Sequence, residues 1–330
     1  MTESAKEKAG LVPIGQIRLL KNLVKEYGPP TRTQRQIIDA AVAIHEQPDA
    51  AERAFMARQL VQCTLPHTDP GNVEQWARCT GHIVLGITPG RDFEKNRSIG
   101  YPYGIIPRLL LFWVITEAVQ TRTRRLVLGR SLAEFMRAVG LNPHRGGKRG
   151  DRKRLEQQMQ RLFKCHISFQ ATANQPDTHG EAWLNMEVAP RGELWWHPHP
   201  NQTALWESWI ELGEKFFEAV VASPVPLDMR ALRALRRSPL ALDLYSWASY
   251  RAFVIVQKNQ PPQFVAWTVL MRQLGADYSD PKNFKRKAGA ALRKIARLYP
   301  GLAIGKARGG FTIHAARLAV PQKTAGKLPA

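Results

Sequence analysis

The sequence predicts a mainly α (α+β) protein in which two tandem winged helix-turn-helix domains follow a helical N-terminal region. The first observation is an order of elements that occurs twice: helix, short strand, helix, turn, helix and hairpin, which is the order of a winged helix. The second is spacing, because Ser131 precedes Phe163 by 32 positions and Thr268 precedes Tyr299 by 31. The third is composition: 44% of the residues are hydrophobic, enough for buried cores, although the net charge is +21.

This strongly basic composition indicates a polyanionic partner. Lys and Arg number 48 against 27 Asp and Glu in 330 residues, and such an excess on a folded surface attracts nucleic acid. A membrane surface would attract it too. The longest apolar run, 109–115, is however shorter than the roughly 18–20 residues of a spanning helix, so we expect no membrane partner.

The start of the chain and its cysteines predict a location. The first ten residues do not resemble a secretory signal. The three cysteines form no CxxC pair and are odd in number, so we expect no disulfide framework. A reducing bacterial cytoplasm fits both features, with the protein associated with nucleoid or plasmid DNA.

Residues 1–95 are predicted to form a helical auxiliary region, and residues 1–60 suggest no role of their own. We expect helices at 14–27, from a cap at Thr31 or Thr33 to His45, and at 50–62. Alternating residues predict a strand at 82–88. The polar segment 91–97 then indicates a boundary near residue 96.

The first winged-helix domain is predicted to cover residues 96–218. Helices are expected at 104–120, 131–139 and 151–164, and a short strand at 126–128. Ser131 and Glu134 have the spacing of a capping box. A Gly- and Arg-rich turn, 140–150, separates the last two helices, and the strands 166–173 and 182–188 form the expected wing.

The second winged-helix domain is predicted to cover residues 219–318. Its helices are expected at 239–253, from a Thr268 cap to Leu274, and at 282–299, with a strand at 264–267. The wing is a tight hairpin of residues 302–305 and 311–314 around Arg308. Residues 319–330 are expected to be a flexible tail.

The third helix of each unit combines an apolar stripe with a basic face. Leu155, Met159, Leu162 and Phe163 form the first stripe, and Phe284, Ala288, Leu292, Ile295 and Tyr299 form the second. Arg favours guanine and Gln favours adenine at base edges, so both outward faces could read DNA. The predicted DNA contacts are Arg145, Lys148, Arg149, Lys153, Arg154, Gln157, Gln160, Arg161, Lys164, Lys282, Asn283, Arg286, Arg293, Arg297 and Arg308.

Each such face alone could be a solvated surface of a core helix. The stretch 282–297, however, holds seven Lys or Arg and no acid. Two basic faces at the same position of a repeated unit favour DNA recognition over a merely solvated surface.

Long ordered blocks of the chain resemble the RepA-type replication initiators that plasmids encode. The blocks are YPYGIIPRLLLFWVITEAVQTRTRRLVLGRSLAEFMRAVGL, LEQQMQRLF and VPLDMRALRALRRSPLALDLYSWASYR, and the resemblance runs from roughly residue 60 to 316. It implies two winged-helix domains that bind direct repeats (iterons) at a plasmid origin, open the neighbouring AT-rich DNA and recruit host initiation and helicase-loading proteins. It also implies a monomer and a homodimer, autorepression by the dimer, a part in plasmid copy control, and no catalytic residues.

Two alternative functions stay open. The first is a transcriptional repressor without origin activity, whose sites would form one inverted repeat rather than tandem direct repeats. The second is a metal-dependent DNA-nicking Rep enzyme, in which His197 and His199 hold a metal near Tyr278 and Lys282 completes a YxxxK spacing. Pro198 argues against it, because proline disfavours the interior strand that such a histidine pair needs.

The remaining motifs favour no cofactor. Cys63, His67, Cys79 and His82 are zinc-ligand types in a mixed arrangement, so we expect no metal. No GxxxxGK[ST] loop occurs, so unwinding would come from binding energy or recruited partners. Four tryptophans could stack on single-stranded bases, although such clusters more often form core between domains: Trp195, Trp196, Trp206 and Trp209.

Overall fold

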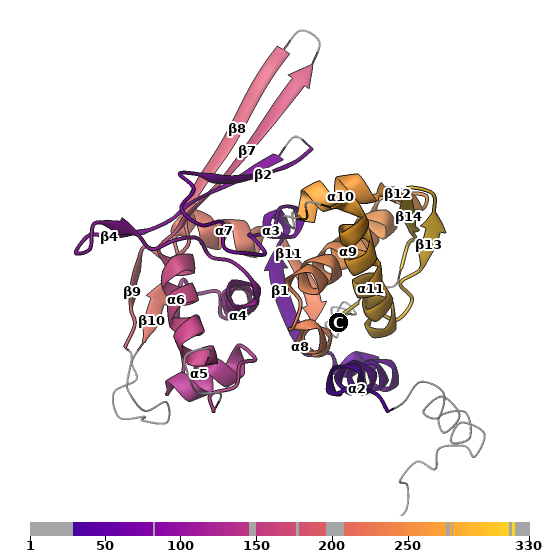
Figure 1. Ribbon diagram of the computed structural model, residues 1–330, viewed down its shortest axis with the longest axis horizontal. Coiled ribbons are helices and arrows are strands. Elements are labelled where there is room, and N and C mark those ends of the chain that lie inside the picture. The colour runs from indigo at the N-terminus through magenta and orange to yellow at the C-terminus, as the bar shows by residue number, and fades with distance from the viewer. Residues whose placement is uncertain are drawn as a thin grey trace, which may run out of the picture.

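The computed structural model describes residues 29–81, 83–144, 150–175, 178–195, 208–274, 278, 280–316 and 319–320. They form a mixed α+β structure in which helices dominate and the strands make five small sheets. We call residues 101–222 the first lobe and residues 229–316 the second lobe. Figure 1 shows the two lobes side by side, with a two-stranded sheet between them.

The helices of the first lobe lie where the sequence predicts them. They are α4 (Ile105–Thr121), α5 (Leu132–Ala138), α6 (Asp151–Phe163) and α7 (Glu214–Ala222), and only α7 was not predicted. Helix α4 is apolar on nearly every side and is accordingly buried over most of its length. The Ser131 hydroxyl accepts a hydrogen bond from the Glu134 N–H (3.2 Å) at the start of α5. The Glu134 carboxylate accepts from the Arg130 N–H instead of completing the capping box on Ser131.

The hairpin that the sequence predicts as the first wing forms, but it belongs to a larger sheet than expected. Strands β7 (His166–Gln175) and β8 (Thr178–Glu187) do form a hairpin, but β7 pairs with β3 (Ile83–Thr88), which pairs with β2 (Trp76–Thr80). Figure 1 shows this hairpin projecting away from the lobe. Ile167 and Phe169 are buried in this four-stranded sheet, and their partners lie some eighty residues earlier in the chain.

A different pair of strands takes the position expected of the wing. Strand β6 (Arg125–Val127) pairs with β10 (Trp209–Glu211), and β10 pairs with β9 (Arg191–Glu193). The strand order β6-β10-β9 is the same as the order β12-β14-β13 in the second lobe. The two lobes therefore share a sheet layout that the sequence pattern located correctly only in the second.

The second lobe follows its predicted order closely. It contains α8 (Met229–Leu235), α9 (Pro239–Gln257), β12 (Gln263–Ala266), α10 (Trp267–Leu274), α11 (Pro281–Leu298), β13 (Ile304–Ala307) and β14 (Gly310–Ile313). Helix α10 begins one residue before Thr268, so Thr268 is not its cap. Asp280 caps α11 by accepting from the N–H groups of Lys282 (2.9 Å) and Asn283 (3.3 Å).

The N-terminal region joins both lobes. Helix α2 (Arg32–Glu46) has the predicted Thr31 cap, and Gln34 completes a capping box with it. The predicted helix 50–62 is wrong in its first half: after the 3₁₀ turn η1 (Pro48–Ala50), residues Arg53–Ala57 form β1, and only α3 (Arg58–Gln62) is helical. Strand β1 pairs with the unpredicted β11 (Pro224–Asp228), a partner too distant in sequence for local periodicity to reveal.

Two further strands, β4 (Arg91–Asp92) and β5 (Arg97–Ser98), form a small hairpin in the expected linker. The domain boundaries at residues 95, 218 and 318 stay a prediction. Among the described helices, none is long and apolar enough to cross a membrane.

A buried ion pair also connects the lobes. The Arg108 guanidinium on α4 donates to both carboxylate oxygens of Asp243 on α9, at 2.8 and 2.7 Å. Its other donors reach the backbone carbonyls of Leu65, Pro66 and Gly104, so all five of its N–H groups are used. The His67 ring lies 2.7 Å from the same carboxylate. Residues from three distant parts of the chain are thereby held at one point.

Candidate nucleic-acid interface

Helix α11 separates its apolar and basic residues onto two faces. Phe284, Ala288, Leu292 and Ile295 are buried, and α11 packs against α9, α10 and α2. Tyr299, the last residue of the predicted stripe, is also buried and lies just beyond the helix. This packing determines which side of α11 remains in solvent.

The outward face of α11 is densely cationic. All seven of its basic side chains are exposed: Lys282, Lys285, Arg286, Lys287, Arg293, Lys294 and Arg297. In the described part of the chain none of them forms an ion pair with a carboxylate. Arg286 donates to the Asn283 side-chain oxygen at 3.0 Å, which brings these two predicted contacts together. Unpaired guanidinium and ammonium groups on one helix face are suited to phosphates and base edges.

Small residues lie within this basic face. Gly289 and Ala290 are only partly exposed, and a Cβ at Gly289 would lie 3.7 Å from an Arg293 guanidinium nitrogen. At that distance an added Cβ would make an ordinary van der Waals contact, so the position of Arg293 does not require glycine here. A groove wall could approach the backbone closely at this point.

The β13–β14 hairpin presents another cation beside α11. Arg308 is exposed at its tip, where Gly309 has a φ of +77°, a conformation that favours glycine. Arg308 therefore projects from the tip of the hairpin that the sequence predicts as the second wing.

Helix α6 carries a weaker basic face than α11. Lys153, Arg154, Gln157 and Lys164 are exposed as predicted, whereas Gln160 is partly buried. Arg154 lies 3.6 Å from the Asp151 carboxylate, and Arg152 forms an ion pair with Glu156 at 3.0 Å. These two acids reduce the positive charge of the helix.

Arg161 differs from the prediction that it faces outward. Its guanidinium donates to the Asp69 carboxylate and to the Tyr101 carbonyl, both at 3.2 Å. It also lies 5.1 Å from the centre of the Tyr103 ring. The segment 69–103 is remote in sequence, so helical periodicity could not place it over this side of α6. Arg145, Lys148 and Arg149 lie outside the described residues.

A second group of arginines lies between the lobes, and the sequence analysis predicted only Arg154 among them. A groove of about 550 Å³ is lined by Arg32 at the start of α2, Arg154 on α6, and Arg236 and Arg237 after α8. Arg236 donates to the Gly140 carbonyl (2.8 Å) and Arg237 to the Thr33 hydroxyl (2.8 Å). The run LRALRRSP was the available signal, but only tertiary packing brings it beside Arg32 and Arg154.

Comparison with known proteins assigns the family. The sequence profile described as plasmid-encoded RepA protein matches residues 101–269, just over half of the chain. The chain belongs to the RepA family of plasmid-encoded replication initiators. The predicted resemblance is thereby confirmed. No curated protein matches the chain in a sequence search.

Two solved structures are similar to this RepA-family chain. One is the crystal structure of RctB domains 2–3, at 11% identity and a TM-score of 0.46, covering 78% of this chain and 96% of that one. The other, of selenomethionine derivatives of RctB domains 2 and 3, has 12% identity and a TM-score of 0.45 and covers 78% and 95%. Because both TM-scores are below 0.5 and both identities are below 25%, nothing about this chain is concluded from these two structures.

The RepA-family structure describes only some residues of the alternative metal sites, and among these Cys63 lies near Cys79. Within the described ranges, no group of three His, Cys, Asp or Glu could hold a metal ion. His67 is bonded to Asp243, and Cys63 is buried while Cys79 is exposed. His82, His197 and His199 lie outside those ranges.

The aromatic residues considered for nicking or for base stacking make contacts that are common in folded proteins where the structure describes them. Tyr278 lies edge-on to Phe284, with ring centres 5.6 Å apart, and burial raises the pKa of its phenol although Arg286 opposes this. Trp209 is partly buried under the Arg125 guanidinium, 4.1 Å from the ring centre. Trp195 is exposed, unlike a core residue, and Trp196 and Trp206 are not described.

Proposed function

We propose that this RepA-family chain is a tandem winged-helix protein that binds duplex DNA at repeated sites of a plasmid origin. Helix α11 enters the major groove, and the β13–β14 wing with Arg308 contacts the flanking backbone. The observation that carries the proposal is the outward face of α11: seven exposed cations, no acid, and no ion pair among the described residues.

The first lobe supports a second DNA contact of the same kind. Helices α5 and α6 follow β6 as α10 and α11 follow β12, and the sheets share one strand order. In this proposal β9 and β10 form the first wing, and Lys153, Arg154, Gln157, Gln160 and Lys164 face the DNA. Arg145, Lys148 and Arg149 in the preceding turn stay predicted contacts, whereas Arg161 supports the fold.

The arginines between the lobes extend the surface. Arg32, Arg236 and Arg237 would contact the phosphates of DNA that passes from one lobe to the other, because phosphate contacts fix register without reading sequence. Two lobes that bind one duplex need such a continuous basic path.

The family resemblance supplies the rest of the proposal. Binding of the repeats opens neighbouring AT-rich DNA and recruits host initiation and helicase-loading proteins. A homodimeric form represses the promoter of its own gene and so takes part in copy control. The chain performs no chemistry on DNA in this scheme.

Footprinting of the full chain on the plasmid's own DNA tests this function. Protection of tandem direct repeats, lost when Arg286 and Arg293 are both changed to Ala, is the expected result. Lys215→Ala, an exposed lysine on α7 outside the predicted contacts, is the control. Protection of a single inverted repeat at a promoter would instead establish a repressor.

The nicking alternative has its own assay. Supercoiled DNA incubated with the protein and Mg²⁺ or Mn²⁺ should stay intact. Nicking that Tyr278→Phe abolishes, with DNA bound covalently to the wild-type chain, would replace the proposed function by that of an enzyme.

A further inference from the structure

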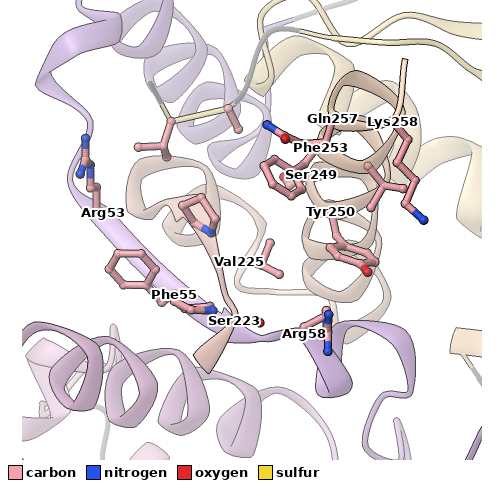
Figure 2. Close-up of a pocket in the computed structure, with 15 residues that line it drawn as sticks. Arg53, Phe55, Arg58, Ser223, Val225, Ser249, Tyr250, Phe253, Gln257 and Lys258 are labelled. Carbon is pink, nitrogen blue, oxygen red and sulfur yellow. The ribbon is translucent and has the colours of Figure 1, made fainter. Parts of the chain in front are cut away.

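A pocket of about 590 Å³ lies between β1, β11 and the C-terminal half of α9, and none of the predicted DNA contacts lines it. Figure 2 shows its apolar wall, which includes Phe55, Val225 and Phe253. Val320 also lines it. A concave, mainly apolar site of this volume is typical of small-molecule binding.

Cations surround this apolar wall. Arg53, Arg58 and Lys258 line the pocket, and Figure 2 shows them coming from different sides of it. None of the described residues that line it is acidic. Arg58 and Lys258 are exposed, and no carboxylate of the described residues pairs with either. The occupant should therefore be anionic at its polar end.

A buried polar group lies on the wall formed by α9. Ser249 is 5% exposed, and its hydroxyl lies beside the buried Tyr245 phenol, whose oxygen also accepts a hydrogen bond from the Asp228 N–H at 3.1 Å. A hydroxyl that accepts a hydrogen bond from a neighbouring phenol keeps its own proton, and where it lines a pocket it can donate that proton to a ligand.

Larger occupants fit these features less well. A DNA duplex is too wide for a pocket of this volume. Residues 1–28 and 321–330 of the chain itself are net basic, so like charges disfavour them. A strand added to β11 is disfavoured because Pro224 and Pro226 have no N–H to donate. A small acid remains.

We propose that this pocket binds a small amphiphilic carboxylate, with an aromatic or medium-chain acyl body. The body packs between Phe55, Val225 and Phe253. The carboxylate lies at the cationic rim near Arg58, and Ser249 donates a hydrogen bond inside the pocket. Because β1 packs on α4 and α9 belongs to the second lobe, the ligand sits where elements of both lobes meet.

Calorimetric titration of the full chain with 1-naphthoate and with decanoate tests the proposal. Saturable binding of at least one acid at a single site is expected. The neutral analogue, 1-naphthalenemethanol or decanol, should bind at least about fivefold more weakly, because it loses the attraction to the cationic rim. Failure of both acids to bind saturably would overturn the proposal.

Two variants locate the site. Arg58→Glu should weaken binding of the acid at least about fivefold, whereas Lys215→Glu, the same change of charge on α7, should leave it nearly unchanged. Val254→Trp should abolish binding by filling the pocket, and thermal melting verifies that it folds. Equal affinities of the Arg58 and Lys215 variants, or unchanged binding by a folded Val254→Trp, would place the acid elsewhere and refute the site.

Discussion

At the scale of single residues, the same side-chain type has different roles on the two predicted recognition helices. Arg161 on α6 is held by Asp69, Tyr101 and the Tyr103 ring, so it stabilises the first lobe. Arg286 on α11 is exposed, donates a hydrogen bond to Asn283 of its own helix and forms no ion pair with a described carboxylate. Substitution of these two arginines should therefore have opposite consequences.

Arg286→Ala is expected to weaken binding of the specific site by about 1–3 kcal/mol, as for loss of a base or phosphate contact, while the melting temperature stays nearly the same. Arg161→Ala should lower the melting temperature and change affinity little. Gel-shift titration at one salt concentration and thermal melting measure the two effects. If Arg286→Ala, Arg293→Ala and Arg297→Ala all bind like wild type, the placement of the second reading helix is wrong.

His67 lets the buried network between the lobes be tested by pH. Burial lowers the pKa of its imidazole, and Arg108 adds to this, although Asp243 opposes both. Burial would raise the pKa of Asp243, but Arg108 and His67 outweigh it and hold that pKa at about 2. Both groups thus have lower pKa values in the folded state, so the unfolded chain binds more protons on acidification.

The free energy of unfolding should therefore fall as the pH drops below 6.5, the pKa of His67 in the unfolded chain. It should fall again between pH 3.8, the pKa of Asp243 in the unfolded chain, and about 2, its pKa in the folded chain. Urea midpoints measured from pH 7.5 to 5.5 should decline, and His67→Gln should flatten the decline. His144→Gln, at an exposed position, is the control. An equal pH dependence in wild type and His67→Gln would contradict the role assigned to His67.

At the scale of elements, α11 divides its sequence between folding and recognition. Leu292 and Ile295 are buried, whereas Lys294 between them is exposed. The helix can therefore change its outward residues without losing its packing.

Leu292→Ala or Ile295→Ala should lower the free energy of unfolding by roughly 2–5 kcal/mol, because each leaves a cavity in the core. Lys294→Ala, on the same turn of the helix, should change it by less than about 0.5 kcal/mol. Urea denaturation of the three variants measures this. Equal stability of all three would mean that α11 does not pack as described.

At the scale of the whole molecule, the cations proposed to contact DNA form three groups among the described residues: α11 with its hairpin, α6, and the arginines between the lobes. A net charge of +21 makes association with any polyanion dependent on salt. If six to ten phosphates are contacted, affinity should fall by roughly a thousandfold or more between 50 and 200 mM salt.

The groove between the lobes predicts how that salt dependence changes. Arg32→Ala combined with Arg237→Ala should reduce the slope of log K against log salt by about 0.9 for each lost phosphate contact. Arg233→Ala is the matched control, because Arg233 is paired with Glu52 at 2.6 Å. Fluorescence anisotropy at several salt concentrations measures the slope, and identical slopes would remove these arginines from the DNA path.

The sequence by itself determined the family, most of the helices (α7 and α8 excepted) and the two faces of α11. These features are local: apolar residues three and four positions apart define a buried stripe whatever the rest of the chain does. The second lobe was predicted nearly completely because its sheet is built from neighbouring segments. Strand β14 of its hairpin pairs with β12, at most fifty residues earlier in the chain.

Only the tertiary structure decided which strands pair, and which cations remain available. Strand β1 pairs with β11, and β7 pairs with β3, although long stretches of chain separate the partners. Asp69 likewise forms an ion pair with Arg161, which is remote from it in sequence. The periodicity of apolar residues predicts which face of a helix or strand a residue occupies, but not which segment packs against that face. Contacts between segments distant in sequence depend on how the packed elements meet, and the local pattern does not contain that information.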